Sequence, residues 1–310
     1  MLLSCGDALI DFVPVTLPDG RDGYVPAVGG SCLNIAVAMA RLGAPAGFVS
    51  AISTDLFGDM IAAHMAASNV RFDHLERSER ENTLAFVKIV DGEPHYAFYD
   101  ENSAVRNWRW TPGSIDFSTV EVVHVGSTTL INDPVSSETL KMVEDAAGRT
   151  VVSLDPNCRP SLTKDRDDYR RRIEALMRHA DILRMSDVDF DFLYGDADWD
   201  AKAAEWLGVN PVLVLITRGG EGAVAWHRAA GRIEVPAPKV TVADTIGAGD
   251  TFQAGTLVAL HDGGFLARER LAAMTADEIR GCVAFGIRAA AITVSRPGAN
   301  PPWRHEMDAR

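Results

Sequence analysis

A run of small residues that ends in an acid, from Asp244 to Asp250, holds the residues of this chain best suited to chemistry. Gly247, Ala248 and Gly249 put little side chain between their backbone N–H groups and an anion, and glycine tolerates the positive φ of a concave backbone. The apolar run that follows predicts a helix whose free N–H groups point at the same place. Asp250, at the start of that helix, is placed to accept a proton from a hydroxyl. An anion site beside a general base is what phosphoryl transfer to an alcohol requires, whereas a turn that only opens a core helix leaves Asp250 unexplained.

The length and composition indicate one large α/β domain with an appendage, or two modest domains. The chain has 310 residues, of which 47% are hydrophobic and 24% charged, as is typical of a globular protein with a sizeable core. The formal net charge of -13 argues against a nucleic-acid surface, which needs a basic patch. ATP is not excluded, because a few local N–H groups and a bound Mg²⁺ can outweigh a diffuse surface charge.

The cysteines and the apolar runs bear on location. Cys5, Cys32, Cys158 and Cys282 are scattered and show no paired spacing, so metal fingers and redox pairs are not expected. A reducing cytoplasm is the predicted location. No run is long and apolar enough to cross a membrane, so no membrane partner is expected.

The spacing of apolar residues predicts strands and helices that alternate along much of the chain. That order is typical of a parallel sheet covered by helices on both faces. The last helix, at 278–294, is expected to run into a strand. The other predicted strands are 2–6, 48–52, 122–125, 150–154, 182–185 and 212–217, and the other predicted helices are 31–42, 60–67, 136–147, 169–180 and 200–207.

Two segments outside that pattern predict a small β flap, called the lid below. Residues 83–90 and 94–99 have the pattern of a hairpin around a turn at Asp91 and Gly92. Residues 14–28 are rich in Pro, Gly and Asp, which indicates a loop or an edge strand. Together the segments could cover one edge of the main sheet. A further hairpin is predicted at 222–227 and 231–235.

The segment from Asp244 to Phe252 resembles the C-terminal motif of the ribokinase-like (pfkB) carbohydrate kinase family, in which the aspartate after Gly-Ala-Gly is the catalytic base. Further matches follow in the family's order from Asp11 to Gly298, and Asp155 to Arg159 is most similar to fructokinase-type members. The resemblance implies a three-layer α/β/α ribokinase-like fold with a mostly parallel central sheet, formed by residues 1–310 as a single domain. It also implies a small β-sheet lid formed by about 12–29 and 83–107.

The resemblance assigns residues near the first helix and the lid to a sugar. Gly29 and Gly30, with Asn34 one turn into the helix, suit a polyhydroxyl ligand, and a tight turn with a polar helix-face residue is the alternative. Phe98 would lie over the sugar ring unless it faces the core, and Arg159 would reach the substrate unless it is solvated. The implied substrate-binding residues are Asp11, Gly29, Gly30, Asn34, Phe98, Arg159 and Asp250, with Gly247, Ala248 and Gly249 beside Asp250 in the catalytic motif.

A second set of residues is implied to hold ATP and its metal. Residues 217–222 resemble the family's glycine-rich nucleotide turn, with a plain turn between strands as the alternative. Ser186 and Asp189 match an element that organises Mg²⁺ through water, although Ser186 also suits a helix N-cap. Asp244 matches an acid that binds a monovalent cation such as K⁺, but the expected serine is replaced by Pro302. The implied nucleotide-binding residues are Ser186, Thr217, Gly219, Gly220, Gly222, Gly249 and Gly286.

The resemblance implies an ATP-dependent sugar kinase that converts fructose to fructose 6-phosphate, with Asp250 as general base. Relatives that phosphorylate 2-keto-3-deoxygluconate carry an arginine at the place of Asp100, which would repel that substrate's carboxylate, so a neutral sugar is expected. Ribose, 2-keto-3-deoxygluconate and nucleosides are the alternatives within the family, and a non-catalytic sugar or nucleotide sensor is the alternative outside it. An oxidoreductase is disfavoured because no Gly-x-Gly-x-x-Gly follows the first strand. Pairing through the lid is frequent in the family, so a homodimer is expected.

Overall fold

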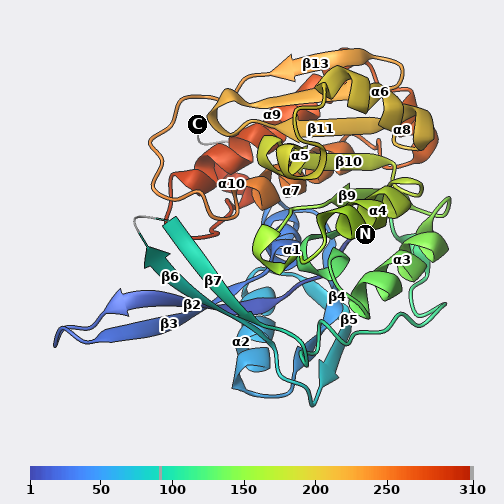
Figure 1. The fold of residues 1–310 in the computed structure, drawn as a ribbon. Helices are drawn as coiled ribbons and strands as arrows, with labels where there is room; N and C mark the ends of the chain where they lie inside the picture. Colours follow the sequence, from blue (N-terminus) through green and yellow to red (C-terminus); the bar gives the residue numbers. More distant parts are fainter. Residues whose placement is uncertain (91–92, 308–310) are drawn as a thin grey trace.

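The computed structural model describes residues 1–90 and 93–307, and it places a layered α/β body beside a smaller sheet (Figure 1). Within the described residues, nine strands form the main sheet in the order β13-β12-β11-β10-β9-β8-β1-β4-β5. The strands from β11 to β5 in that order run parallel, and β12 runs antiparallel to both of its neighbours, β11 and β13. The strands are β1 (Leu2–Cys5), β4 (Ala46–Ser53), β5 (Arg71–Ser78), β8 (Val122–Gly126), β9 (Val151–Asp155), β10 (Ile182–Ser186), β11 (Leu213–Thr217), β12 (Ala223–His227) and β13 (Gly231–Val235).

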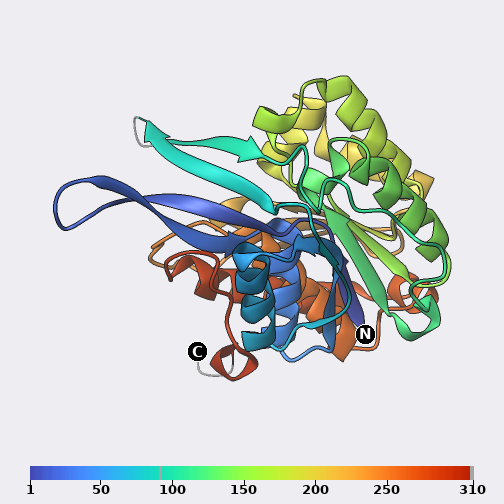
Figure 2. The ribbon, with the colours of Figure 1, turned by 90° about the horizontal axis from the view of Figure 1, so that it is seen from below.

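Helices cover both faces of the main sheet (Figures 1 and 2). Alternation along β1 sends Leu2 into one core with α1, α2, α7 and α9, and sends Leu3 into a second core with α3, α4, α5 and α6. The three expected layers are therefore present. The helices are α1 (Ser31–Arg41), α2 (Leu56–Ala67), α3 (Val135–Ala146), α4 (Arg166–Met177), α5 (Asp187–Tyr194), α6 (Trp199–Val209), α7 (Ala248–Asp262), α8 (Arg268–Ala272), α9 (Ala276–Val294) and α10 (Arg304–Met307).

The lid is a separate sheet in the order β3-β2-β6-β7, whose two hairpins extend away from the body (Figure 2). Its strands are β2 (Leu9–Thr16), β3 (Asp22–Gly29), β6 (Thr83–Val90) and β7 (Glu93–Tyr99). The predicted turn at Asp91 and Gly92 lies outside the described residues. Phe12 and Phe86 stack with ring centroids 4.5 Å apart, which joins the two hairpins across the parallel β2–β6 pair. Phe12 also meets Phe57 of α2 edge to face, so the lid is anchored to the body at its base.

The order of strands reverses beside β1. The chain leaves β1 for β4 on one side and later reaches β8 on the other, so the loops after β1 and β8 diverge at a topological switch point, where open α/β sheets bind ligands. Asp7, after β1, accepts hydrogen bonds from the backbone N–H of Cys32 (2.9 Å) and from the Ser127 hydroxyl (2.8 Å). These bonds fix the start of α1 at the switch point.

Several segments differ from the sequence-based expectations. Residues 14–28, expected as loop or edge strand, belong to the β2–β3 hairpin. β5 was not predicted, because its side chains are largely exposed and polar and show no apolar alternation. α2 begins earlier than expected because Asp55 caps its N-terminus. The prediction of a strand after α9 is wrong, because residues 295–303 form a turn and a loop. Among the described helices, none has the length and apolarity needed to span a bilayer.

Glycines let α7 and α9 pack closely. A Cβ atom on Gly255 would lie 2.9 Å from Cα of Gly286, and a Cβ atom on Gly286 would lie 2.6 Å from the carbonyl oxygen of Phe252. Real Cβ atoms do not approach backbone atoms so closely, so a side chain at either position forces the helices apart.

This contact predicts opposite effects for two alanine substitutions in α9. We expect Gly286→Ala to lower the free energy of unfolding by about 1–3 kcal/mol, because the added methyl group overpacks the helix contact. Gly281→Ala is the matched control: Gly281 is exposed with nothing near its Cβ position, so the change should raise stability by about 0.5–1 kcal/mol. Urea denaturation measures both, and a neutral or stabilising Gly286→Ala would contradict the close contact.

Candidate functional site

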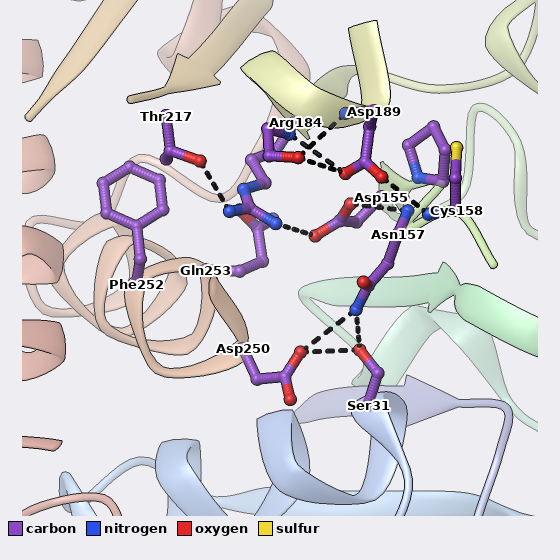
Figure 3. A network of polar contacts seen from close by, with 12 residues as sticks. Ser31, Asp155, Asn157, Cys158, Arg184, Asp189, Thr217, Asp250, Phe252 and Gln253 are labelled. Carbon is purple, nitrogen blue, oxygen red and sulfur yellow. Dashed lines mark hydrogen bonds and ion pairs between the residues drawn. The ribbon is translucent and has the colours of Figure 1, made fainter. Parts of the chain in front are cut away.

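The Asp250 carboxylate lies at the N-terminal end of α7 and is only 7% exposed (Figure 3). Gly247 precedes the helix with φ of 73°, in the left-handed region that favours glycine. The Ser31 hydroxyl donates to Oδ1 of Asp250 (2.6 Å), and Nδ2 of Asn34 donates to Oδ2 (2.9 Å). Nδ2 of Asn157 donates to Oδ1 over 3.3 Å. The carboxylate is therefore held by α1 and by the loop after β9.

Burial shapes the proton affinity of this group. Desolvation raises the pKa of Asp250 above its ordinary value, while the hydrogen bonds from Ser31 and Asn34 and the positive charge of Arg159 lower it. The carboxyl is thus a better proton acceptor than an exposed aspartate, and its donors oppose protonation of the resting group. Such a balance is typical of general bases.

Several residues implied for the sugar gather on the lid side of Asp250. Asp11 lies on β2, and burial raises its pKa to about 6, with Arg159 lowering the pKa and Asp7 raising it. Gly29 faces Asp11 so closely that a Cβ atom there would collide with Oδ2 of Asp11. Gly30 has φ of 112°, and a Cβ atom on it would lie 2.5 Å from the carbonyl oxygen of Asp7. Both glycines are thus required by close approach of other groups.

Asn34, Arg159 and Phe98 have contacts that qualify the assignment to a sugar. Nδ2 of Asn34 donates to Oδ2 of Asp250, so one of its amide hydrogens is already used within the protein. Arg159 donates hydrogen bonds from Nη1 to Oδ1 of Asn157 (2.6 Å) and to nearby carbonyls, and forms no ion pair among the described residues. Phe98 lies on β7 beside a cavity of about 670 Å³ along the lid, and its place over a sugar ring stays a prediction.

The negative charge of Asp100, which the sequence sets against an anionic sugar, is partly neutralised by Arg106. Nη1 of Arg106 lies 3.1 Å from Oδ2 of Asp100, and both side chains are mostly buried. The pair weakens the repulsion that Asp100 alone would exert on an anionic sugar. The inference of a neutral substrate therefore needs support from elsewhere.

A cavity of about 250 Å³ lies on the other side of the α7 N-terminus. Five of the implied nucleotide residues line it, and Ile287, Ala290 and Ala291 of α9 form an apolar wall. The cavity contains the start of α7, whose first N–H groups have no acceptor within the helix. Such amides suit a phosphate group. The implied residues in the lining are Thr217, Gly219, Gly220, Gly222 and Gly249.

Two implied nucleotide residues lie elsewhere. Gly286 faces α7 at the helix contact described above and does not line the cavity, so its part in nucleotide binding is at most to let α9 approach. Ser186 caps α5, as its alternative interpretation allowed, and forms a capping box with Asp189.

The acids implied for metals are occupied by protein donors. Asp189 accepts from the backbone N–H groups of Cys158 (2.8 Å) and Ser186 (3.1 Å) and from the Ser186 hydroxyl. Asp244 accepts from the backbone N–H groups of Ile246 (3.0 Å) and Gly298 (2.8 Å). In the part of the chain that is described, no three acidic, histidine or cysteine side chains cluster as a metal site. Both acids are therefore already hydrogen bonded within the protein.

The sequence reasoning missed a buried arginine, Arg184, which lines the cavity and joins a network of polar contacts (Figure 3). Arg184 donates from Nη1 to Oδ2 of Asp155 (2.6 Å) and from Nη2 to Oγ1 of Thr217 (2.7 Å). A Cβ atom on Gly249 would lie 2.8 Å from Nη2, so the bare backbone there leaves room for the guanidinium. The signal was a single charge inside the apolar strand β10, because a buried charge must be paired.

Comparison with known proteins is consistent over almost the whole chain. The family model described as pfkB family carbohydrate kinase matches residues 1–306. The chain is 38% identical over 280 residues to a fructokinase of Rhizobium leguminosarum bv. trifolii, covering 90% of this chain and 86% of that one. It is 32% identical over 320 residues to probable fructokinase-2 of Arabidopsis thaliana, covering 100% and 94%. A solved fructokinase with bound ATP from Xylella fastidiosa gives a TM-score of 0.91 at 28% identity, covering 99% and 97%.

Proposed function

The chain belongs to the pfkB family of carbohydrate kinases, and we propose that it transfers the γ-phosphate of ATP to the primary hydroxyl of fructose. The position of Asp250 carries this proposal. Its buried carboxylate lies at the start of α7, which borders the small-residue cavity, and its own partners come from the sugar-side elements. A group so placed touches both substrates of a phosphoryl transfer.

In the proposed reaction, Asp250 accepts the proton of the sugar hydroxyl as the hydroxyl oxygen attacks the terminal phosphorus. The N–H groups of residues 247–250 hold the negative charge that develops on the transferred group. The lid lies over the sugar side and would exclude water, which otherwise competes as the acceptor. Mg²⁺ bound to the nucleotide would neutralise phosphate charge, with Asp189 proposed to act through water.

Fructose is the proposed sugar because both sequence relatives described above are named as fructokinases. The sugar side of the site also carries the Asp11 carboxylate and the Arg159 guanidinium, which can hydrogen bond the hydroxyl groups of a neutral ketose.

The substrate proposal is tested with a coupled ADP-release assay. Fructose, ribose, 2-keto-3-deoxygluconate and adenosine are compared at equal concentration with MgATP, and we expect fructose to have the highest kcat/KM. Parallel arms omit Mg²⁺ with a chelator present, or replace K⁺ by Na⁺. The first arm should abolish turnover, and a K⁺ effect would support a cation site at Asp244. A higher kcat/KM for another acceptor would overturn fructose as the substrate.

The role of Asp250 predicts the outcome of Asp250→Asn. The amide keeps the shape but cannot accept the proton, so kcat should fall by roughly 10²-fold or more, while fructose binding measured by calorimetry stays largely intact. Asp262→Asn, at the exposed far end of the same helix, is the control and should leave kcat unchanged. Near-normal turnover of Asp250→Asn would remove this residue from the role of base.

We also propose a homodimer that pairs through the lid. Large apolar side chains are exposed on one face of the lid: Tyr24 is 49% exposed and Tyr99 is 64% exposed, and both contact the ring of Phe86 between them. A second copy of the lid could cover them without blocking the cavity at α7.

Sedimentation velocity tests the dimer. Tyr24→Glu places a charge in the apolar lid surface and should shift the protein toward monomer. Val209→Glu is the control, because Val209 is equally exposed (53%) but lies at the end of α6 on the main body. A wild-type protein that sediments as a monomer at all concentrations would contradict pairing through the lid.

A cytoplasmic location stays a prediction. It is supported by Cys5, Cys32, Cys158 and Cys282, which are all unpaired and buried. Cell fractionation tests it, and activity recovered outside the cytoplasm would contradict it.

A further inference from the structure

Asn157, in the turn after β9, joins the proposed base to the arginine of the sugar side (Figure 3). Its Nδ2 donates to the Ser31 hydroxyl oxygen (2.6 Å) and to Oδ1 of Asp250 (3.3 Å). Its Oδ1 accepts from Nη1 of Arg159 (2.6 Å). No role follows for this residue from the reaction as described so far.

The neighbours of Asn157 fix which way its amide points. A guanidinium can only donate, so the atom that faces Arg159 must be the amide oxygen. The amide nitrogen must then face Ser31 and Asp250, and it has two hydrogen atoms for these two contacts. The oxygen of the Ser31 hydroxyl accepts one of these hydrogen bonds, and the same hydroxyl donates a hydrogen bond to Oδ1 of Asp250 (2.6 Å). The donors and acceptors around the amide therefore allow only this orientation.

The backbone of Asn157 is held in an uncommon conformation. Its φ is 38°, in the left-handed region, which asparagine tolerates better than most residues. The backbone N–H donates to Oδ1 of Asp155 (3.0 Å). The other oxygen of Asp155 receives the buried Arg184 guanidinium, so Asp155 cannot turn away from Asn157 without breaking an ion pair. Conformations of this kind persist at functional sites because the surroundings determine them.

The consequence is an asymmetry between the two oxygens of the base. Oδ1 of Asp250 receives two donors, from Ser31 and Asn157, while Oδ2 receives only Asn34 among the described residues. We propose that Asn157 is a positioning residue: its amide holds Oδ1 of Asp250 and leaves Oδ2 to accept the proton of the sugar hydroxyl. This inference rests on the proposed role of Asp250 as the base.

Loss of the Asn157 amide should change how the base titrates. A carboxylate that loses a donor is less stabilised in its charged form, so the pKa of Asp250 rises and the acid limb of the kcat profile moves to higher pH. The other ionisable groups around Asp250 stay in place and set the starting value. These groups are Asp7, Arg159, Asp155, Arg184 and Cys32.

The test compares Asn157→Gly with Asn69→Gly. Glycine keeps the left-handed backbone available at both positions, and Asn69, with φ of 60°, is exposed after α2 and far from the base in the fold. At saturating fructose and MgATP, we expect Asn157→Gly to lower kcat about tenfold and to move the acid limb upward by roughly one pH unit. The KM for ATP should change little, and Asn69→Gly should match the wild type in all three quantities.

Asn157→Asp carries the same test if the glycine variant does not fold. It keeps the shape, loses the donors and adds a negative charge, so its acid limb should move further upward than that of Asn157→Gly. An acid limb that stays at the wild-type position in the folded variants would overturn the positioning role, whatever the change in kcat. Asp250→Asn is measured alongside: if it keeps turnover, the base assignment fails, and if it is inactive while the limb of Asn157→Gly is unmoved, only the role of Asn157 fails.

Discussion

Withdrawal of the Asp250 carboxylate from water is the constraint on which the site depends. Removing a charge from water costs several kcal/mol unless other groups replace the lost solvation. Here the replacement comes from Ser31 and Asn34 on α1 and from Asn157 after β9. Elements that are distant in the sequence must therefore meet within hydrogen-bond tolerance. The buried helix contacts and the tie between Asp7 and the start of α1 supply that rigidity.

The start of α7 also separates two chemically different spaces. The cavity on one side has small and apolar walls from the turn at 219–222 and from α9, which suits a flat base and leaves the phosphate to backbone N–H groups. The lid side carries Asp11 and Arg159, which suit hydroxyl groups. The start of α7, where Asp250 lies, borders the cavity through Ala248 and Gly249.

The sequence predicted the layered fold, the alternating strands and the lid, and the family comparison confirms the ribokinase-like fold and the carbohydrate kinase class. These features leave local signals such as apolar periodicity or a glycine-rich helix start. β5 left none, because an exposed edge strand needs no apolar alternation. The network from Arg184 to Asn157 was not predicted, because pairing between distant polar side chains follows from tertiary contacts that spacing alone does not encode. Gly286 shows the converse: its small size serves helix packing and not the cavity wall.

The acidic character of the chain would by itself disfavour a phosphate-bearing ligand, so local groups must favour one at the cavity. The formal net charge is -13, and the carboxylates that contribute to it include Asp155, Asp189 and Asp250 at the site. Asp189 is satisfied by backbone N–H groups and Asp155 by Arg184, so neither projects an uncompensated field into the cavity. A phosphate group in the cavity would then face the N-terminus of α7 and the Arg184 guanidinium beside Gly249. Because screening confines the surface charge to short range, these fixed dipoles decide the interaction.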